Sequence, residues 1–307
     1  MDILISGSHG LIGSALTSWL ASDGHRVVRL VRPPRVPAPD EISWDPAAGI
    51  IDPAGLEGMD AVIHLAGEGI ASGRWTPATK RRICESRVRG TGLLAGALAR
   101  ARRGPRTLIC ASAIGYYGNR GEEILVEESA PGSGFLADVT RKWEAAAEPA
   151  RQAGLRVVNL RSGIVLSPAG GALARLLPVF RLGLGGRLGT GRQFMSWITI
   201  DDEVGAIGHA LQHASMSGPV NLVSPQPVTN REFARTLGRV LRRPAVFPVP
   251  AAVLRMALGE VSSEVLGSLR VHPAALLAAG YSFRHPDLET GLRAILNPSA
   301  VSQAAGL

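Results

Sequence analysis

The turn that follows the first predicted strand constrains the fold more than any other feature of this chain. Positions 2–6 suit a buried strand, glycines stand at positions 7, 10 and 13, and a helical pattern begins at position 11. In a βα turn of this kind, the glycines allow a tight turn, close approach of a pyrophosphate and packing of helix on strand. The helix start then offers free N–H groups and a positive dipole end to phosphate. Because the motif has both its strand and its helix, we expect a dinucleotide site with contacts at Gly7, Ser8, His9, Gly10, Leu11, Ile12 and Gly13.

Strand-like and helix-like segments alternate through most of the chain. This order predicts an α/β fold with a doubly wound parallel Rossmann sheet and right-handed crossovers. The expected strands are Asp2–Ser6, Arg26–Val31, Ala61–Leu65, Thr107–Ala111, Arg156–Leu160 and Val220–Val223. The expected helices are Leu11–Asp23, Pro77–Arg100 and Ala137–Gly154.

The alternation weakens in the second half, where glycine and proline become frequent. We therefore expect residues 1–165 and 200–224 to form the nucleotide-binding domain. Residues 166–199 and 225–297 are expected to form a smaller C-terminal domain that caps the carboxyl ends of the strands, where ligands of such sheets bind. Residues 298–307 are expected to be a flexible tail.

Composition narrows the class of protein. With 46% hydrophobic residues, a chain of 307 residues can bury a sizeable core. No uninterrupted apolar run is long enough to span a bilayer. Because the first predicted strand begins directly after the initiator methionine, we expect no secretory leader. Two cysteines, Cys84 and Cys110, are too few for a disulfide scaffold, and no His/Cys cluster has metal-ligand spacing. We expect a cytoplasmic protein without a metal and without a membrane partner.

The formal charge of +8 does not predict nucleic-acid binding. Lysine occurs only twice, and arginines are spread from Arg26 to Arg293. The densest basic cluster runs from Lys80 to Arg89 on a predicted helix, and only one aromatic residue lies near it. A solvated helix face explains this cluster best, an anionic-ligand site comes second and nucleic acid third.

Several further motifs point to one family. They include His64-Leu-Ala-Gly67, Gly73-Arg-Trp75, Ser112-Ala-Ile-Gly-Tyr-Tyr-Gly118, Trp143-Glu144, Gly189-Thr-Gly-Arg-Gln193 and Gly259-Glu260. With them, the chain resembles the extended short-chain dehydrogenase/reductase superfamily. Within it, the similarity is to the atypical epimerase-family branch of NAD-dependent epimerase/dehydratase-like proteins, some of which are labelled cell-division inhibitors. It runs from Met1 to about Leu296.

The resemblance carries expectations for the cofactor and for assembly. It implies that the segment His64, Leu65, Ala66 and Gly67 lines the cofactor, with His64 in a structural rather than a proton-transfer role. Relatives often dimerise through the helices near residues 77–100 and 137–154. The arginine-rich faces of these helices leave monomer and homodimer both open here.

The end of the second strand favours NADP(H) over NAD(H). NAD-binding relatives carry an acidic residue there, which binds the adenosine ribose. This chain has Val31 and then Arg32. A guanidinium at this place can pair with a 2′-phosphate, although Arg32 is one of many surface arginines. We therefore expect Arg32 to contact NADP(H).

The usual catalytic residues of the superfamily are missing. Its members use a tyrosine as acid/base and a lysine four residues later, because a phenol titrates near ~10 and needs a neighbouring cation. Four residues beyond the three tyrosines of this chain lie Arg120, Gly121 and His285. Ser112, near the nicotinamide, and Tyr117 remain candidates for catalysis. The absent pair puts the standard oxidoreductase mechanism in doubt.

Asp138 and Lys142 offer a second possibility, because one ungapped count places them at the positions of the missing pair. A carboxylate beside an ammonium relays a proton only if burial raises its pKa. The simpler alternative, an exposed i,i+4 ion pair, is favoured over catalysis.

Six residues are candidates for contact with a small-molecule substrate. They are Glu68, Arg74, Trp75, Arg161, Arg192 and Gln193. The resemblance implies that Arg161, Arg192 and Gln193 face the cleft where relatives hold a nucleotide-sugar diphosphate. Trp75 has the alternative role of anchoring its loop.

Two classes of function follow. The first is an NADP(H)-dependent oxidoreductase or epimerase that acts on a small polar or nucleotide-linked carbonyl or alcohol. The second is an NADP(H)-binding sensor or regulatory protein with little catalysis. The cell-division label of some relatives suggests division proteins as its partners. The missing tyrosine–lysine pair favours the second, whereas the polar loops and the C-terminal module favour the first.

Overall fold

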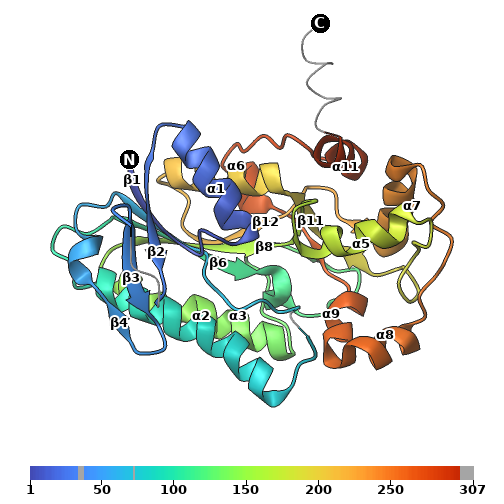
Figure 1. Cartoon of the computed structure of the whole chain (residues 1–307), viewed down its shortest axis with the longest axis horizontal. Coiled ribbons are helices and arrows are strands. Elements are labelled where there is room, and N and C mark those ends of the chain that lie inside the picture. Colours follow the sequence, from blue (N-terminus) through green and yellow to red (C-terminus); the bar gives the residue numbers. More distant parts are fainter. Residues whose placement is uncertain (34–37, 72, 298–307) are drawn as a thin grey trace, which may run out of the picture.

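The computed structural model describes residues 1–33, 38–71 and 73–297. Its centre is an eight-stranded sheet in which every pairing is parallel except that of the last two strands (Figure 1). In spatial order its strands are β12 (Gly218–Leu222), β8 (Arg156–Ser162), β6 (Thr107–Ala113), β5 (Ala61–His64), β1 (Asp2–Ser6), β2 (Arg26–Val31), β3 (Glu41–Asp45) and β4 (Ile50–Ile51). The expected α/β class with a doubly wound parallel sheet is confirmed.

The strand order shows where the chain stops adding strands on one side of β1 and begins to add them on the other side. From β1 the chain builds outward to β2 and β3, and it then returns to β5 on the other side of β1 and continues to β6, β8 and β12. In open α/β sheets, ligands bind outside the carboxyl ends of the strands at this reversal point. The glycine turn after β1 and the segment after β5 therefore meet at the expected ligand site.

Alternating side chains of the strands fill two separate apolar layers, because successive residues of a strand point to opposite faces. Ile3 and Ile5 pack in one core cluster, and Leu4 packs in the other. The first layer is covered by α1 (Leu11–Ser22) and α6 (Ile200–Gln212). The second is covered by α2 (Pro77–Leu98) and α4 (Glu148–Gln152), with α3 (Phe135–Ala145) beside α2.

Two details of the sheet region differ from expectation. The sequence predicted no strand between residues 32 and 60, yet β3 and β4 extend the sheet there. The helix expected over residues 137–154 is divided into α3 and α4, and Pro149 stands in the first turn of α4. Proline lacks the N–H that a helix interior uses in its hydrogen bonding and is best tolerated in the first turn of a helix.

The C-terminal part has its own apolar cluster, which Leu173, Phe180, Trp197, Phe233 and Leu292 share. Its helices are α5 (Gly171–Arg181), α7 (Asn230–Leu241), α8 (Ala251–Leu258), α9 (Ser262–Leu266), α10 (Ala274–Ala278) and α11 (Leu288–Leu296). The expected domain limits stay a prediction, and the tail expected at residues 298–307 lies outside the described residues.

Short strands and turns complete the fold. Paired strands are β9 (Ile164–Leu166) with β11 (Trp197–Thr199), β10 (Phe194–Met195) with β13 (Val228–Thr229), and β7 (Ile124–Leu125) with β14 (Arg270–Val271). The 3-10 turns are η1 (Pro53–Leu56), η2 (Ile114–Tyr117) and η3 (Gly259–Val261). Among the helices that the structure describes, none is both long and apolar enough to cross a membrane.

Asp202 ties the C-terminal part to the sheet. Its buried carboxylate lies in the first turn of α6 and accepts the backbone N–H of Arg284 at 2.7 Å and that of His285 at 3.0 Å. It also receives the hydroxyls of Thr199 and Tyr281 at 3.1 and 3.2 Å. A side chain at the start of α6 thereby holds the chain between α10 and α11.

We predict that Asp202→Asn lowers the free energy of unfolding by about 1–3 kcal/mol, because an amide turns one acceptor oxygen into a donor that faces other donors. Urea unfolding followed by circular dichroism measures the change. The neighbouring Asp201→Asn is the control: its side chain is half-exposed, and the expected loss is below about 0.5 kcal/mol. Equal losses of unfolding free energy for the two variants would contradict the role of Asp202 in holding the C-terminal part to the sheet.

Candidate functional site

The turn after β1 is shaped to receive a phosphate. Gly7 has φ +73°, and a Cβ on Gly13 would lie 2.2 Å from the carbonyl oxygen of Gly7. A side chain at either position therefore has no room. Gly10 is the N-cap of α1 and makes no side-chain hydrogen bond. The backbone N–H groups of the first turn are therefore not capped by a side chain of that residue. These features fit a bound dinucleotide phosphate.

The other residues expected in this turn occupy three kinds of position. His9 and Gly10 are exposed, and Leu11 and Ile12 are half-buried. Ser8 is buried, and its carbonyl accepts the hydroxyl of Ser14 at 3.3 Å. The turn therefore offers its backbone, small side chains and the exposed ring of His9 to a ligand.

The structure brings the segment after β5 against this turn. A Cβ on Gly7 would lie 2.7 Å from the backbone carbon of Leu65, and the N–H of Leu65 donates to the carbonyl of Ser6 at 3.1 Å. Leu65 and Ala66 are half-buried, whereas Gly67 is exposed. The two predicted cofactor segments thus form one continuous surface at the reversal point of the sheet.

His64 lies beneath that surface. Its ring is buried, its Nδ1 lies 2.6 Å from the hydroxyl of Ser6, and Trp44 packs against it edge to face. Burial lowers the pKa of His64 to about 4, so the ring is neutral at pH 7. A buried neutral ring cannot exchange a proton with a ligand, and this matches the structural role expected for it.

Arg32 follows β2 immediately and is exposed. Val31, at the end of the strand, is apolar and buried. No carboxylate therefore stands at the position where a ribose-binding acid would lie.

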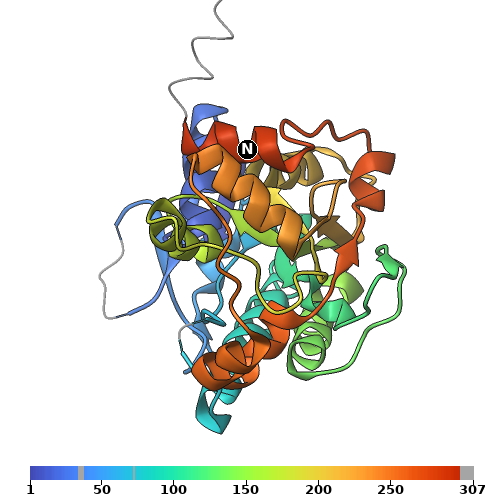
Figure 2. The same cartoon turned by 90° about the vertical axis from the view of Figure 1, so that its right-hand side faces the viewer.

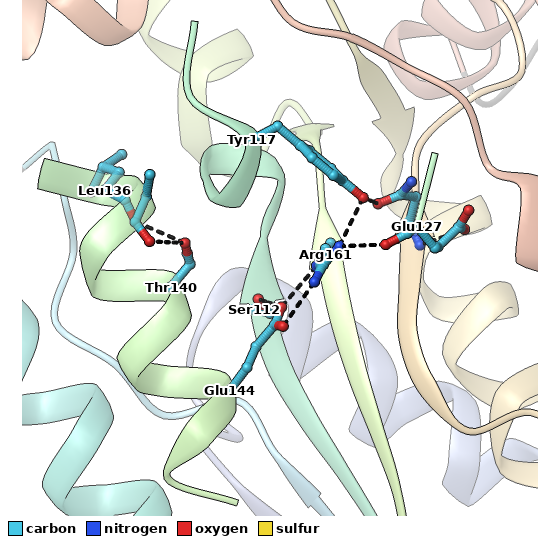
Figure 3. A network of polar contacts seen from close by, with 9 residues as sticks. Ser112, Tyr117, Glu127, Leu136, Thr140, Glu144 and Arg161 are labelled. Atoms are coloured by element: carbon cyan, nitrogen blue, oxygen red, sulfur yellow. Dashed lines mark hydrogen bonds and ion pairs between the residues drawn. The ribbon is translucent and has the colours of Figure 1, made fainter. Parts of the chain in front are cut away.

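A buried ion pair joins β8 to α3 (Figure 3). Arg161 of β8 is 3% exposed, and its Nε and Nη2 lie 2.8 and 2.9 Å from the two carboxylate oxygens of Glu144 of α3. Ser112, which is paired with Arg161 across neighbouring strands, donates its hydroxyl to Glu144 at 2.7 Å. Because its single proton is directed to Glu144, the Ser112 hydroxyl can accept a hydrogen bond but has none left to donate.

Tyr117 belongs to the same network. It is fully buried, donates its hydroxyl to Asn221 at 2.7 Å and accepts Nη1 of Arg161 at 3.0 Å. Burial raises the pKa of Tyr117 to about 12, even though Arg161 opposes the shift. The phenol is thus more weakly acidic than usual and has no open side toward a ligand. The catalytic role expected for Tyr117 does not fit this geometry.

The alternative favoured for Asp138 and Lys142 of α3 agrees with the structure in their exposure but not in their pairing. Asp138 and Lys142 are exposed, and Asp138 pairs with Arg141 in place of Lys142. The buried face carries Leu136 and Thr140, which also stand four apart (Figure 3). Thr140 donates its hydroxyl to the carbonyl of Leu136 at 2.8 Å.

The three arginines expected to hold substrate do not line a common site. Two of them are hydrogen-bonded to other parts of the protein, and the third is exposed. Arg161 is enclosed in the buried network, and its guanidinium also stacks on Tyr116, 3.5 Å from the ring centre. Arg74 donates Nη2 to the carbonyl of Met256 at 2.6 Å, at the end of α8. Arg192 is exposed.

The remaining three candidates have structural contacts. Trp75 is 8% exposed and donates its indole N–H to the carbonyl of Ile70 at 2.8 Å, which supports the alternative of a loop anchor. Gln193 is buried and donates to the carbonyl of Leu188 at 3.0 Å. Glu68 uses its backbone N–H to bind the hydroxyl of Ser86 at 3.0 Å, and its side chain is partly exposed.

A cleft of about 770 Å³ opens between the start of α3 and the segment from α8 to α9. Figure 2 shows α8 and α9 beside the ends of α2 and α3. Lys80 of α2 forms an ion pair with Glu260 of η3 across this junction. Of the predicted substrate residues, the cleft is lined by Trp75 alone. Its volume suits a small-molecule ligand.

Sequence reasoning missed Glu144 as the partner of Ser112 and Arg161. The Trp143-Glu144 motif gave a signal, but nothing in the sequence showed which strand the carboxylate meets. Glu203 was also missed: it is buried and accepts the hydroxyl of Ser162 at 2.6 Å. Across residues 1–33, 38–71 and 73–297, no three His, Cys, Asp or Glu side chains gather as a metal-binding group.

Comparison with known proteins gives consistent matches along the whole chain. The model of the NAD dependent epimerase/dehydratase family matches residues 3–222, and a domain of unknown function, DUF1731, matches residues 249–295. The epimerase family protein MT2273 of Mycobacterium tuberculosis is 48% identical over 94% of this chain and 96% of its own length. The human epimerase family protein SDR39U1 is 38% identical over 96% of this chain and 100% of its own.

Solved structures agree with these matches. The crystal structure of human SDR39U1 (isoform 2) with NADPH has a TM-score of 0.88 and 37% identity, and the match covers 96% of this chain and 99% of that one. MoeE5 in complex with UDP-glucuronic acid and NAD has a TM-score of 0.76 at 22% identity, covering 98% of this chain and 100% of that one. The second likeness concerns the fold alone.

Glu144→Ala is predicted to lower the free energy of unfolding by about 3–5 kcal/mol, because it leaves the buried guanidinium of Arg161 without its counter-ion. Chemical denaturation measures the loss. Asp138→Ala, on the exposed face of the same helix, serves as the control with an expected loss below about 1 kcal/mol. A small loss for Glu144→Ala would show that the pair is not a structural centre.

Glu203 makes stability depend on pH. Burial raises the pKa of Glu203 from 4.5 to about 8, and the hydroxyl of Ser162 only partly offsets this. The folded state therefore keeps the proton that the unfolded state loses between these two values. The contribution of Glu203 to native stability is therefore fully present below the unfolded pKa of 4.5 and is lost as pH rises toward 8.

In Glu203→Gln, which resembles the protonated acid, we expect a smaller fall of the unfolding free energy between about pH 5 and pH 8, by roughly 1 kcal/mol per pH unit. Denaturation at several pH values tests this. Comparing the two proteins at each pH cancels the titration of His64 and other groups. Glu122→Gln, at an exposed site, should follow the wild type; the idea is wrong if Glu203→Gln does so as well.

Proposed function

Because this chain belongs to the NAD-dependent epimerase/dehydratase family, we propose that it is an NADP(H)-dependent oxidoreductase or epimerase-like protein. In this proposal the dinucleotide binds along the turn after β1, and a small carbonyl or alcohol occupies the cleft beside α3. The observation that carries the proposal is the juxtaposition of the Gly7–Gly13 turn with the segment after β5 at the reversal point of the sheet.

The residues of the turn fit the cofactor in detail. The positions of Gly7 and Gly13 leave no space for a Cβ, and the open N–H groups at the start of α1 suit a pyrophosphate. The backbone from Leu65 to Gly67 would line the dinucleotide farther along the sheet edge. When bound, the nicotinamide supplies hydride transfer. The protein supplies binding and orientation.

Arg32 supports NADP(H) over NAD(H). It is exposed directly after β2, and Val31 offers no carboxylate to a ribose. A guanidinium binds a 2′-phosphate through paired, charge-assisted hydrogen bonds. The human relative solved with NADPH supports the same choice.

Ser112 and Glu144 act in this proposal as positioning residues. The Ser112 hydroxyl is fixed by Glu144 and is free only to accept a hydrogen bond. Neither side chain lines the cleft, so neither contacts the substrate in this proposal.

One observation favours the alternative of an NADP(H)-binding sensor with low turnover. The inward face of α3 carries Leu136 and Thr140, and neither side chain titrates near neutral pH. Both functions require cofactor binding. Turnover of NADPH with a carbonyl compound separates them, because a sensor binds without consuming.

Arg32→Ala is predicted to weaken NADPH binding about tenfold, equivalent to about 1.4 kcal/mol, and to change NADH binding by less than about twofold. Fluorescence titration of cofactor-free protein measures both constants. The control is Arg29→Ala, which removes a half-exposed arginine of β2 that pairs with Asp40; it should leave both constants unchanged. Equal losses for the two cofactors contradict the assignment of Arg32, and binding of neither by the wild type contradicts the proposed function.

A further inference from the structure

The charge of the cleft beside α3 does not suit a polyanion. Its lining contains two carboxylates, Glu260 and Glu264, and one guanidinium, Arg255. Glu260 is neutralised by Lys80, with which it forms an ion pair. Arg255 and Glu264 then cancel in formal charge. The cleft as a whole offers no net positive charge to a ligand.

The arginines that would otherwise supply this charge are bound by other partners. The guanidinium of Arg161 is bound on one edge by both oxygens of Glu144 and on its face by the ring of Tyr116. Arg74 is held by the last carbonyls of α8, at 2.6 Å from Met256 and 3.4 Å from Ala257. Recognition of a diphosphate by side chains relies on free guanidinium or ammonium donors. Arg255 remains as a single donor on an exposed helix.

Apolar and aromatic side chains form one wall of the same cleft. Trp75 and Phe135 meet edge to face, with ring centres 5.0 Å apart. Leu136 extends this surface from α3, and Leu266 and Leu269 face it from the C-terminal part. Such a wall gains free energy by removing apolar ligand surface from water, and aromatic rings favour an aromatic partner.

The polar groups of the cleft are mainly uncharged. The hydroxyls of Ser262 and Ser263 donate to the carbonyls of Gly259 and Glu260, at 2.5 and 2.7 Å. Asn119 accepts the backbone N–H of Ser268 at 3.0 Å. These side chains give a ligand a few oriented hydrogen-bonding groups but no counter-charge.

From this lining we propose that the cleft selects an uncharged carbonyl compound with an aromatic part, and that it excludes nucleoside-diphosphate sugars. That the ligand is a carbonyl compound rests on the function proposed above. The exclusion rests on the charges of the cleft and on the engaged state of Arg161 and Arg74.

A matched pair of probes tests the selection. Methyl benzoylformate and benzoylformate share a phenyl ring and a ketone, but only the second carries a negative charge. Each is titrated by calorimetry into wild-type protein, with and without NADP⁺, so that no hydride is available. UDP-glucose is titrated in the same way. Because burial raises the pKa of Glu264, the experiments are run at about pH 8.

We expect the ester to bind at least about tenfold more tightly than the anion or UDP-glucose. Glu264→Gln should raise the affinity for benzoylformate several-fold, because it removes a like charge. Glu85→Gln, on the exposed face of α2, should change none of the three affinities. Tighter or equal binding of benzoylformate or UDP-glucose overturns the inference, as does a complete lack of ester binding.

The two proposals fail in different measurements. Ester binding without NADP⁺ binding would leave the cleft assignment intact and remove the cofactor assignment. NADP⁺ binding without ester binding would do the reverse.

Discussion

One buried guanidinium holds together segments that are far apart in the sequence. Arg161 binds Glu144 of α3, the hydroxyl of Tyr117 after β6, and the carbonyl of Glu127 in the following loop. Tyr117 passes the connection to Asn221 of β12, whose side-chain amide donates to the carbonyl of His272 at 3.0 Å. The sheet, the helix layer and the C-terminal part thus meet around one charge.

Such a buried ion pair carries a large desolvation cost, so its net contribution to stability is small when it is intact. The guanidinium has all of its hydrogen bonds only when these partners are in place. Ser112 receives its direction from the same carboxylate. The positions of Ser112 and Tyr117 are therefore set by this buried network. This explains why two residues that the sequence indicated as catalytic are enclosed in the fold.

The sequence was sufficient for those features that depend on local pattern. The glycine turn after β1 was predictable because a side chain at Gly7 or Gly13 would collide with backbone. The strand β3 was not, because Ile42 and Trp44 lie in a short segment between loops, and its pairing with β2 is settled only in three dimensions.

The candidate site shows the same division. The rotation of α3 about its axis places Leu136 and Thr140 inward and Asp138 and Lys142 outward. The helical spacing of Leu136, Val139 and Trp143 indicates this buried face, whereas an ungapped count toward the missing pair does not. Likewise, no spacing shows that Arg161 pairs with Glu144, seventeen positions earlier. Exposed Arg32 needed no tertiary information, because its place follows from the end of β2.

Leu11, at the start of the phosphate-binding helix, also touches the C-terminal part. A Cβ on Gly170, just before α5, would lie 3.1 Å from its side chain. The two positions therefore share one limited volume. Across homologous sequences, a larger residue at position 170 should accompany a smaller one at position 11, so that variation in the phosphate turn and variation in the cap are statistically linked.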